Sequence, residues 1–150
     1  MSKIVLLDAG PLGMVSNPNA TGVNRECFEW MEGLLVNGFQ VRVPEIADYE
    51  VRRELLRANK TLGLARLDLV KNTIGYLPLT TSIMLRAAEL WAQARNVGMP
   101  TADRKALDCD VIVAAQALEV NGLVATDNVG HLSRFVDARS WRDIKAADLA

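Results

Sequence analysis

Two carboxylates, Asp8 and Asp127, are the first residues of this sequence placed to do chemistry. Each follows a short apolar run, residues 4–7 and 123–126, of the kind typical of a strand buried on both faces of a parallel sheet. Ligands of open α/β sheets bind at the carboxyl edge of the strands, so both carboxylates are expected at that edge. Asp8 taken alone is equally explained as a helix cap or as part of a Gly10–Pro11 turn.

Two further acids are expected at the same edge. Glu50 lies in the first turns of a helix predicted from about Glu45, after the second strand. Asp110 lies in the first turn of a later apolar helix, where the helix dipole favours its ionised form. A crossover helix runs antiparallel to the strands, so the start of the Asp110 helix is predicted on the Asp8 side.

A divalent cation would make such a gathering of carboxylates tolerable. At an effective dielectric near 20, two like charges about 5 Å apart repel by roughly 3 kcal/mol. Hard oxygen ligands suit Mg²⁺ or Mn²⁺, and such ions activate water against a phosphodiester. The single histidine, His131, is expected on the surface, and the sequence has no glycine-rich phosphate loop. Phosphodiester hydrolysis is therefore the predicted chemistry.

Composition favours one domain, residues 1–150, with a hydrophobic core. Two cysteines, Cys27 and Cys109, are too few for a disulfide framework or a zinc site, which fits a reducing cytoplasm. No apolar run is long enough to cross a membrane, and no signal peptide is expected. The net charge of −1 gives no global basic field, so a nucleic acid would have to meet a local patch.

Strand and helix signals alternate along the chain, which predicts an α/β fold: a three-layer α/β/α sandwich with a mostly parallel sheet of four to five strands. Residues 10–21 are expected to form a loop and residues 101–105 a polar connector. The expected strands are residues 4–7, 39–43 (an edge strand), 76–79, 123–126 and about 136–139.

Helical periodicity predicts which faces are buried. The expected core stripe of the helix after the second strand is Val51, Leu55, Ala58 and Leu62. The expected buried side of the helix that follows a cap at residues 80–82 contains Leu85, Ala88 and Trp91. Trp91, with Trp30 and Met31, suits a protein interface as well as a core.

In order and spacing, four segments resemble the PIN-domain ribonucleases, and within them the VapC-like toxins of bacterial toxin–antitoxin pairs. The segments are residues 4–8, 44–55, 110–117 and 124–128, and the resemblance runs over residues 3–139. It implies a PIN-like fold and a metal-dependent endoribonuclease, with single-stranded RNA or tRNA as substrate and Mg²⁺ or Mn²⁺ as cofactor. It also implies a small antitoxin as partner, and a homodimer.

The resemblance assigns roles to individual residues. Asp8, Glu50 and Asp110 match the family's first three acidic positions. The fourth position is supplied by Asp127 or by Asn128. Family members often carry the acidic or amide residue two places after the threonine, where Asn128 stands, whereas Asp127 comes one place after it. Thr126 resembles the hydroxyl that orders the site, or it is simply a buried strand residue.

Several residues near these acids have two interpretations. A helical wheel places Arg53, Arg57 and Lys60 on one stripe with Glu50, either as phosphate contacts or as a solvated face with ion pairs. Arg104 and Lys105 form a second candidate RNA patch. Asp108 is expected to cap the Asp110 helix rather than touch a metal.

Two other functions fit the same pattern. One is a PIN-like RNA-binding module that has lost catalysis, since an Asn at position 128 would weaken one metal position. The other is an acidic-pocket phosphatase or receiver domain, which usually requires a second acid two places after the first, where Gly10 stands.

Overall fold

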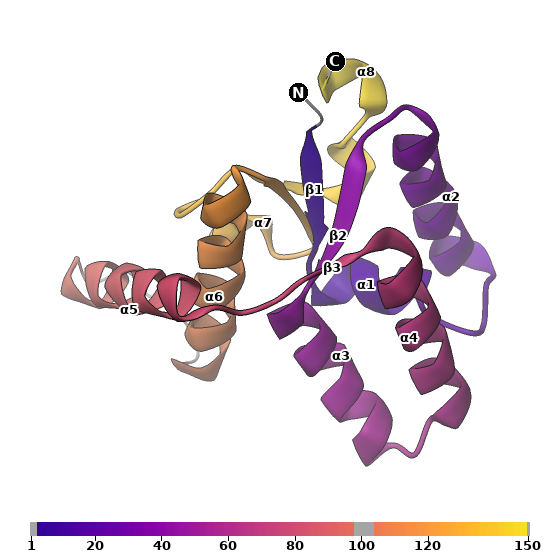
Figure 1. Cartoon of the computed structure of the whole chain (residues 1–150), viewed down its shortest axis with the longest axis horizontal. Helices are drawn as coiled ribbons and strands as arrows, with labels where there is room; N and C mark the ends of the chain where they lie inside the picture. Colours follow the sequence, from indigo (N-terminus) through magenta and orange to yellow (C-terminus); the bar gives the residue numbers. More distant parts are fainter. Residues whose placement is uncertain (1–2, 98–103, 150) are drawn as a thin grey trace.

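The fold is a parallel sheet enclosed between two layers of helices (Figure 1). The structure is a computed structural model that describes residues 3–97 and 104–149. Within them one five-stranded sheet has the order β3-β2-β1-β4-β5, and all its pairs are parallel. The strands are β1 (Ile4–Leu7), β2 (Gln40–Pro44), β3 (Tyr76–Leu77), β4 (Leu123–Thr126) and β5 (Ala138–Ser140). This confirms the predicted α/β sandwich and its parallel sheet.

Helices cover both faces of the sheet, because β1 is apolar on both sides. Val5 and Leu7 pack against α1, α2 and α4, whereas Leu6 packs against α6 and α7. Helix α5 lies outside this second layer and packs on α6. The helices are α1 (Ala9–Val15), α2 (Gly22–Val36), α3 (Glu45–Arg57), α4 (Thr61–Ile74), α5 (Thr81–Asn96), α6 (Arg104–Val120), α7 (Val129–Leu132) and α8 (Ala146–Leu149), with a 3₁₀ turn at Trp141–Asp143.

The strand order creates a switch point between β1 and β4. From β1 the chain builds outward through β2 to β3 and then returns to place β4 on the other side of β1. At such a point the connections leave in opposite directions, and a crevice opens at the carboxyl ends of the strands. Helix α3 starts directly at the end of β2 and extends beyond this edge (Figure 1).

Helix α1 is the largest difference from the predicted elements. The segment 10–21 was expected to be a loop, but α1 occupies Ala9–Val15. Proline is tolerated in a first helical turn because the amides there have no helical partner. Burial of Pro11, Leu12 and Val15 against the sheet then outweighs the two glycines of this helix.

The break between α3 and α4 comes earlier than the periodicity indicates. Helix α3 ends at Arg57, and Asn59 adopts a left-handed φ of 54° before α4 begins at Thr61. Leu62 therefore leaves the predicted core stripe and is 73% exposed. Lys60 leaves the predicted Glu50 stripe for the same reason.

Helices α5 and α6 also differ in detail from the prediction. Helix α5 buries Ile83, Ala87, Leu90 and Ala94, so the predicted buried side with Leu85 and Trp91 was wrong. Helix α6 begins at Arg104, which places Asp108 and Asp110 in its second turn. Asp108 is therefore not the helix cap, and the dipole argument for Asp110 loses its basis because the dipole acts within the first turn.

The remaining sheet differences are small. Strand β2 is internal rather than an edge strand, with β3 as its outer neighbour. Strands β3 and β5 differ from the predicted 76–79 and 136–139 by a few residues at their ends. Among the helices in the described ranges, none has the length and apolar character needed to cross a bilayer.

Candidate active site

A pocket of about 670 Å³ at the switch point contains all four predicted acids. Asp8 follows β1, Asp127 follows β4, Glu50 comes from α3 and Asp110 from α6. The antiparallel course of α6 brings Asp110 to this edge, as its connection to β4 requires. The prediction that these acids lie near one another therefore agrees with the geometry.

Asp8 is held from the neighbouring strand. The buried Thr126 hydroxyl donates to Asp8 Oδ2 at 2.8 Å and accepts from the backbone nitrogen of Asn128 at 2.8 Å. The backbone N–H of Asp8 also donates to the Ala125 carbonyl at 3.0 Å. Asp8 precedes α1, but its side chain makes no capping hydrogen bond to that helix. Its carboxylate is thus oriented by Thr126 rather than used as a cap.

Of the four acids in α3, only Glu50 reaches the acidic pocket. Asp48 forms a two-pronged ion pair with Arg52, at 2.9 and 3.0 Å. Glu54 pairs with Arg57 at 2.9 Å, and the Glu45 carboxylate accepts from the Leu79 amide at 2.6 Å. Glu50 is thus the acid of α3 that faces the pocket, whereas the other three acids of this helix form ion pairs or hydrogen bonds elsewhere.

Asp127 and Asn128 both line the pocket but make different contacts. The Asp127 carboxylate lies directly over Gly10, where a Cβ atom would collide with it. The Asn128 side chain instead lies 3.1 Å from Nδ1 of His131. Of these two residues, Asp127 is therefore the one whose side chain packs against α1.

Burial and mutual repulsion raise the pKa values of three pocket acids, Asp8, Glu50 and Asp110. Burial, and then the Asp8 carboxylate, raise the pKa of Glu50 to about 7 and that of Asp110 to about 6. Burial also raises the pKa of Asp8, against the lowering effect of the Thr126 hydrogen bond. In each case the charged form is disfavoured, so the metal-free pocket stores unfavourable electrostatic free energy at neutral pH.

The donor set fits a hard divalent cation. Asp110 is 8% exposed, and its Oδ2 atom has no hydrogen-bond partner. The other donors are also carboxylate oxygens, the ligand type of Mg²⁺ and Mn²⁺. No three His, Cys, Asp or Glu side chains of the described residues are grouped closely enough to hold a metal ion as they stand. Mg²⁺ commonly binds through one or two carboxylates and retains water, and Asp8 and Asp110 are carboxylates in the lining of this pocket.

Several neighbours of the acids were not predicted as site residues. His131, expected on the surface, is partly exposed, and its Nδ1 atom lies 3.6 Å from Asp110 Oδ2. Cys109 and Tyr49 line the pocket, and burial followed by the Glu50 charge raises the pKa of Cys109 to about 11. Cys109 directly precedes Asp110, but the sequence offered no signal for His131, which depends on where α7 packs.

The predicted RNA-binding residues lie in four different settings. Arg53 lines the acidic pocket and stacks on Tyr49, with 5.1 Å between its guanidinium carbon and the ring centre. Arg57 is engaged by Glu54, whereas Lys60 lines an adjoining cavity that also contains Glu50. The backbones of Arg104 and Lys105 belong to α6, but their side chains lie outside the described part of the structure. Asp108 is exposed and lines the pocket.

Comparison with known proteins identifies the fold. No family model and no curated protein matches the sequence. Among solved structures, a chain of VapBC2 from Rickettsia felis, bound to a promoter DNA fragment, superposes with a TM-score of 0.73 and 16% identity, over 92% of this chain and 98% of that one. VapBC-1 from nontypeable Haemophilus influenzae gives a TM-score of 0.71 and 16% identity, over 93% and 99%.

A third structure, FitAcB from Neisseria gonorrhoeae, gives a TM-score of 0.65 and 18% identity over 93% of this chain and 99% of that one. At these identities the likeness concerns the fold, and it extends over nearly the whole of each chain. The chain thus has the PIN-like fold found in VapBC structures, which confirms at the level of the fold the resemblance to VapC-like toxins.

Proposed function

We propose that this protein is a metal-dependent endoribonuclease that hydrolyses phosphodiester bonds of single-stranded RNA or tRNA, as the toxin of a toxin–antitoxin pair. The observation that carries the proposal is the gathering of Asp8, Glu50, Asp110 and Asp127 in one pocket from four separate elements. The pKa values of Asp8, Glu50 and Asp110 are raised, and clusters of perturbed carboxyl groups are typical of functional sites, which supports the proposal.

The proposed division of labour follows from the contacts. Asp8, fixed by Thr126, and Asp110, whose Oδ2 atom lies 3.6 Å from His131 Nδ1, would hold a Mg²⁺ or Mn²⁺ ion. When bound, such an ion polarises the phosphate and lowers the pKa of an attacking water. Glu50, which lines the same pocket, is the proposed group to accept a proton from an attacking water. Asp127 would complete the acidic set, and Arg53 at the rim is placed for the RNA backbone.

Partners are proposed from the neighbours and from an exposed surface. Two of the matched structures are named as VapBC assemblies, so a small antitoxin is the proposed partner. A homodimer is proposed from the resemblance to VapC-like toxins alone. Helix α5 exposes Met84, Leu85 and Trp91, and a shallow groove of about 420 Å³ runs between α5 and α6. An apolar face of this kind on an outer helix suits a protein contact.

The test is cleavage of a single-stranded RNA by the purified protein. We expect cleavage with Mg²⁺ or Mn²⁺, none in a chelator, and a loss of at least about 100-fold in Asp8→Asn, since metal-ligand substitutions remove most of the catalysis. Asp143→Asn is the matched control, because Asp143 is an exposed acid on the 3₁₀ turn. RNA binding without cleavage in either metal would favour the non-catalytic RNA-binding module instead.

A further inference from the structure

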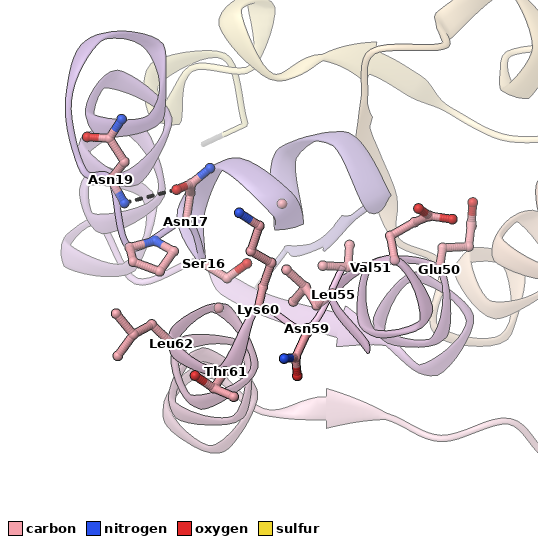
Figure 2. Close-up of a pocket in the computed structure, with 14 residues that line it drawn as sticks. Ser16, Asn17, Asn19, Glu50, Val51, Leu55, Asn59, Lys60, Thr61 and Leu62 are labelled. Atoms are coloured by element: carbon pink, nitrogen blue, oxygen red, sulfur yellow. Dashed lines mark hydrogen bonds between the residues drawn. The ribbon is translucent and has the colours of Figure 1, made fainter. Parts of the chain in front are cut away.

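A second cavity adjoins the acidic pocket and shares Glu50 with it (Figure 2). Its volume is about 730 Å³, which is within the range of small-molecule sites. The end of α1 and the loop after it form one wall, and α3, the α3–α4 turn and the start of α4 form the other. The proposed catalytic machinery uses only the Glu50 end of this space.

Local packing explains why the cavity is open. Gly63 allows α4 to lie close to α3, since a Cβ at that position would come within 2.8 Å of a Leu55 methyl carbon. Gly13 on the α1 side has no side chain, and a Cβ there would meet nothing within 4 Å. Val51 and Leu55 supply apolar lining between these walls. The result is a slot with apolar side chains between two glycine-bearing helices.

Polar groups with donor and acceptor capacity surround this apolar lining. Asn17 and Asn59 contribute amides, and the backbone nitrogen of Asn19 donates to Asn17 Oδ1 at 2.9 Å, which orients that amide. Lys60 extends from the α3–α4 turn toward the α1 side (Figure 2). No carboxylate of the described residues lies within ion-pair distance of Lys60, whereas Glu54 is paired with Arg57.

We propose that this cavity binds the nucleobase of a nucleotide flanking the scissile phosphate, with Lys60 on the RNA backbone. The proposal rests on the proposed ribonuclease function and extends it to substrate selection. A base has apolar faces for Val51 and Leu55, and a polar edge that asparagine amides can read. Leu55 follows Glu50 by about 7 Å along α3, a distance that one nucleotide can bridge.

Charge favours a nucleotide over a basic peptide as the occupant. Lys60 would repel a basic peptide segment. The Glu54 carboxylate already pairs with Arg57, so it would attract such a segment only weakly. Glu50 is the remaining acid of the lining, and it belongs to the pocket where the proposed metal would neutralise it. A nucleotide matches both the cation and the apolar lining of the cavity, because its phosphate can lie next to Lys60 while its base packs on the apolar side chains.

The first test fills the cavity. Gly13→Phe would project a ring into the slot, and Gly33→Phe is the matched control because a Cβ there also meets nothing within 4 Å, on the exposed face of α2. We expect Gly13→Phe to raise the KM for single-stranded RNA about fivefold or more, the scale of losing one stacked base. The Mn²⁺-induced rise in melting temperature should be unchanged, and Gly33→Phe should match the wild type.

The second test removes one amide without straining the backbone. Asn59→Gly deletes an amide at a φ of 54°, and Asn121→Gly is the matched control at a φ of 51°, in the turn between α6 and β4. Both glycines accept a positive φ. Cut sites mapped by sequencing on a random single-stranded RNA pool should lose base preference at one flanking position in Asn59→Gly and in Gly13→Phe, but not in the controls.

The outcomes separate this proposal from the proposed function. If the wild type cleaves RNA and both Gly13→Phe and Asn59→Gly keep its KM and its base preference, the cavity is not a nucleotide subsite, which is also the result that a peptide occupant would give. If the wild type does not cleave RNA in any divalent metal, the proposed function and this extension of it fail together.

Discussion

Individual side chains at this site are set by contacts between elements far apart in the sequence. The hydroxyl of Thr126 joins Asp8 to the loop after β4 through two hydrogen bonds of 2.8 Å. The residue is fully buried, so loss of its hydroxyl would remove a hydrogen-bond partner from the Asp8 carboxylate and from the backbone N–H of Asn128. Thr126 therefore supports both the fold and the orientation of the first acid.

Thr126→Val tests this double role. The substitution keeps the shape of the side chain but leaves the backbone N–H of Asn128 without its hydrogen-bond partner. We therefore expect a loss of about 1–3 kcal/mol in the free energy of unfolding. Urea unfolding in a chelator measures the loss. Thr73→Val, which removes one hydrogen bond from an exposed face of α4, should cost less. Equal losses in the two variants would contradict the role given to Thr126.

Glu50→Gln should stabilise the metal-free protein at pH 8. The folded-state pKa of Glu50 is raised from 4.5 to about 7, so the folded protein holds its proton more tightly than the unfolded chain. Stability from this group is present below pH 4.5 and is lost as the pH rises through about 7. A neutral Gln avoids that loss, so the gain in melting temperature should be larger at pH 8 than at pH 5.

The control for this prediction is Glu119→Gln, an exposed acid near the end of α6. It should change the melting temperature by the same small amount at both pH values. A Glu50→Gln protein that is less stable than the wild type at pH 8 in a chelator would show that the Glu50 carboxylate is not under electrostatic strain.

At the scale of elements, the sequence predicted what depends on strand ends and missed what depends on packing. Asp8 and Asp127 could be placed because parallel strands bring their carboxyl ends to one edge. Helix α1 could not be predicted, because Gly10, Pro11 and Gly13 have the composition of a turn. Only burial against the sheet makes this segment helical. The buried side of α5 depends on its packing against α6, which helical spacing alone does not specify.

The close approach of α1 to the end of β4 gives a prediction for Gly10→Ala. The added Cβ would displace the Asp127 carboxylate, the end of an exposed and movable side chain, so the fold should tolerate it. We expect a melting temperature near that of the wild type but a fall in kcat/KM of roughly tenfold or more, as misplaced groups commonly cause. Gly130→Ala in α7, where a Cβ meets nothing within 4 Å, is the control.

Full activity in Gly10→Ala would mean that the position of Asp127 is unimportant for the chemistry. A large loss of stability would mean instead that α1 itself is displaced. Either result would contradict the role given to Gly10, which is to provide room for the Asp127 carboxylate and not to stabilise the fold.

At the scale of the whole molecule, charge is arranged locally rather than globally. The chain has a net charge of −1 at pH 7, and five carboxylates line the pocket at the switch point: the four predicted acids and Asp108. An RNA strand approaching that pocket without a cation would meet a negative surface. Metal binding is therefore the first requirement of the proposed function, ahead of RNA recognition by Arg53 or Lys60.

Thermal unfolding with and without Mn²⁺ tests this requirement most directly. At 100 times the dissociation constant a bound ion adds about 2.7 kcal/mol, which for a chain of this size raises the melting temperature by roughly 5–10 °C. We expect this rise for the wild type and none for the double variant Asp8→Asn, Asp110→Asn. No rise for the wild type at millimolar Mn²⁺, or an equal rise in the double variant, would contradict a metal-binding site at the carboxyl ends of β1 and β4.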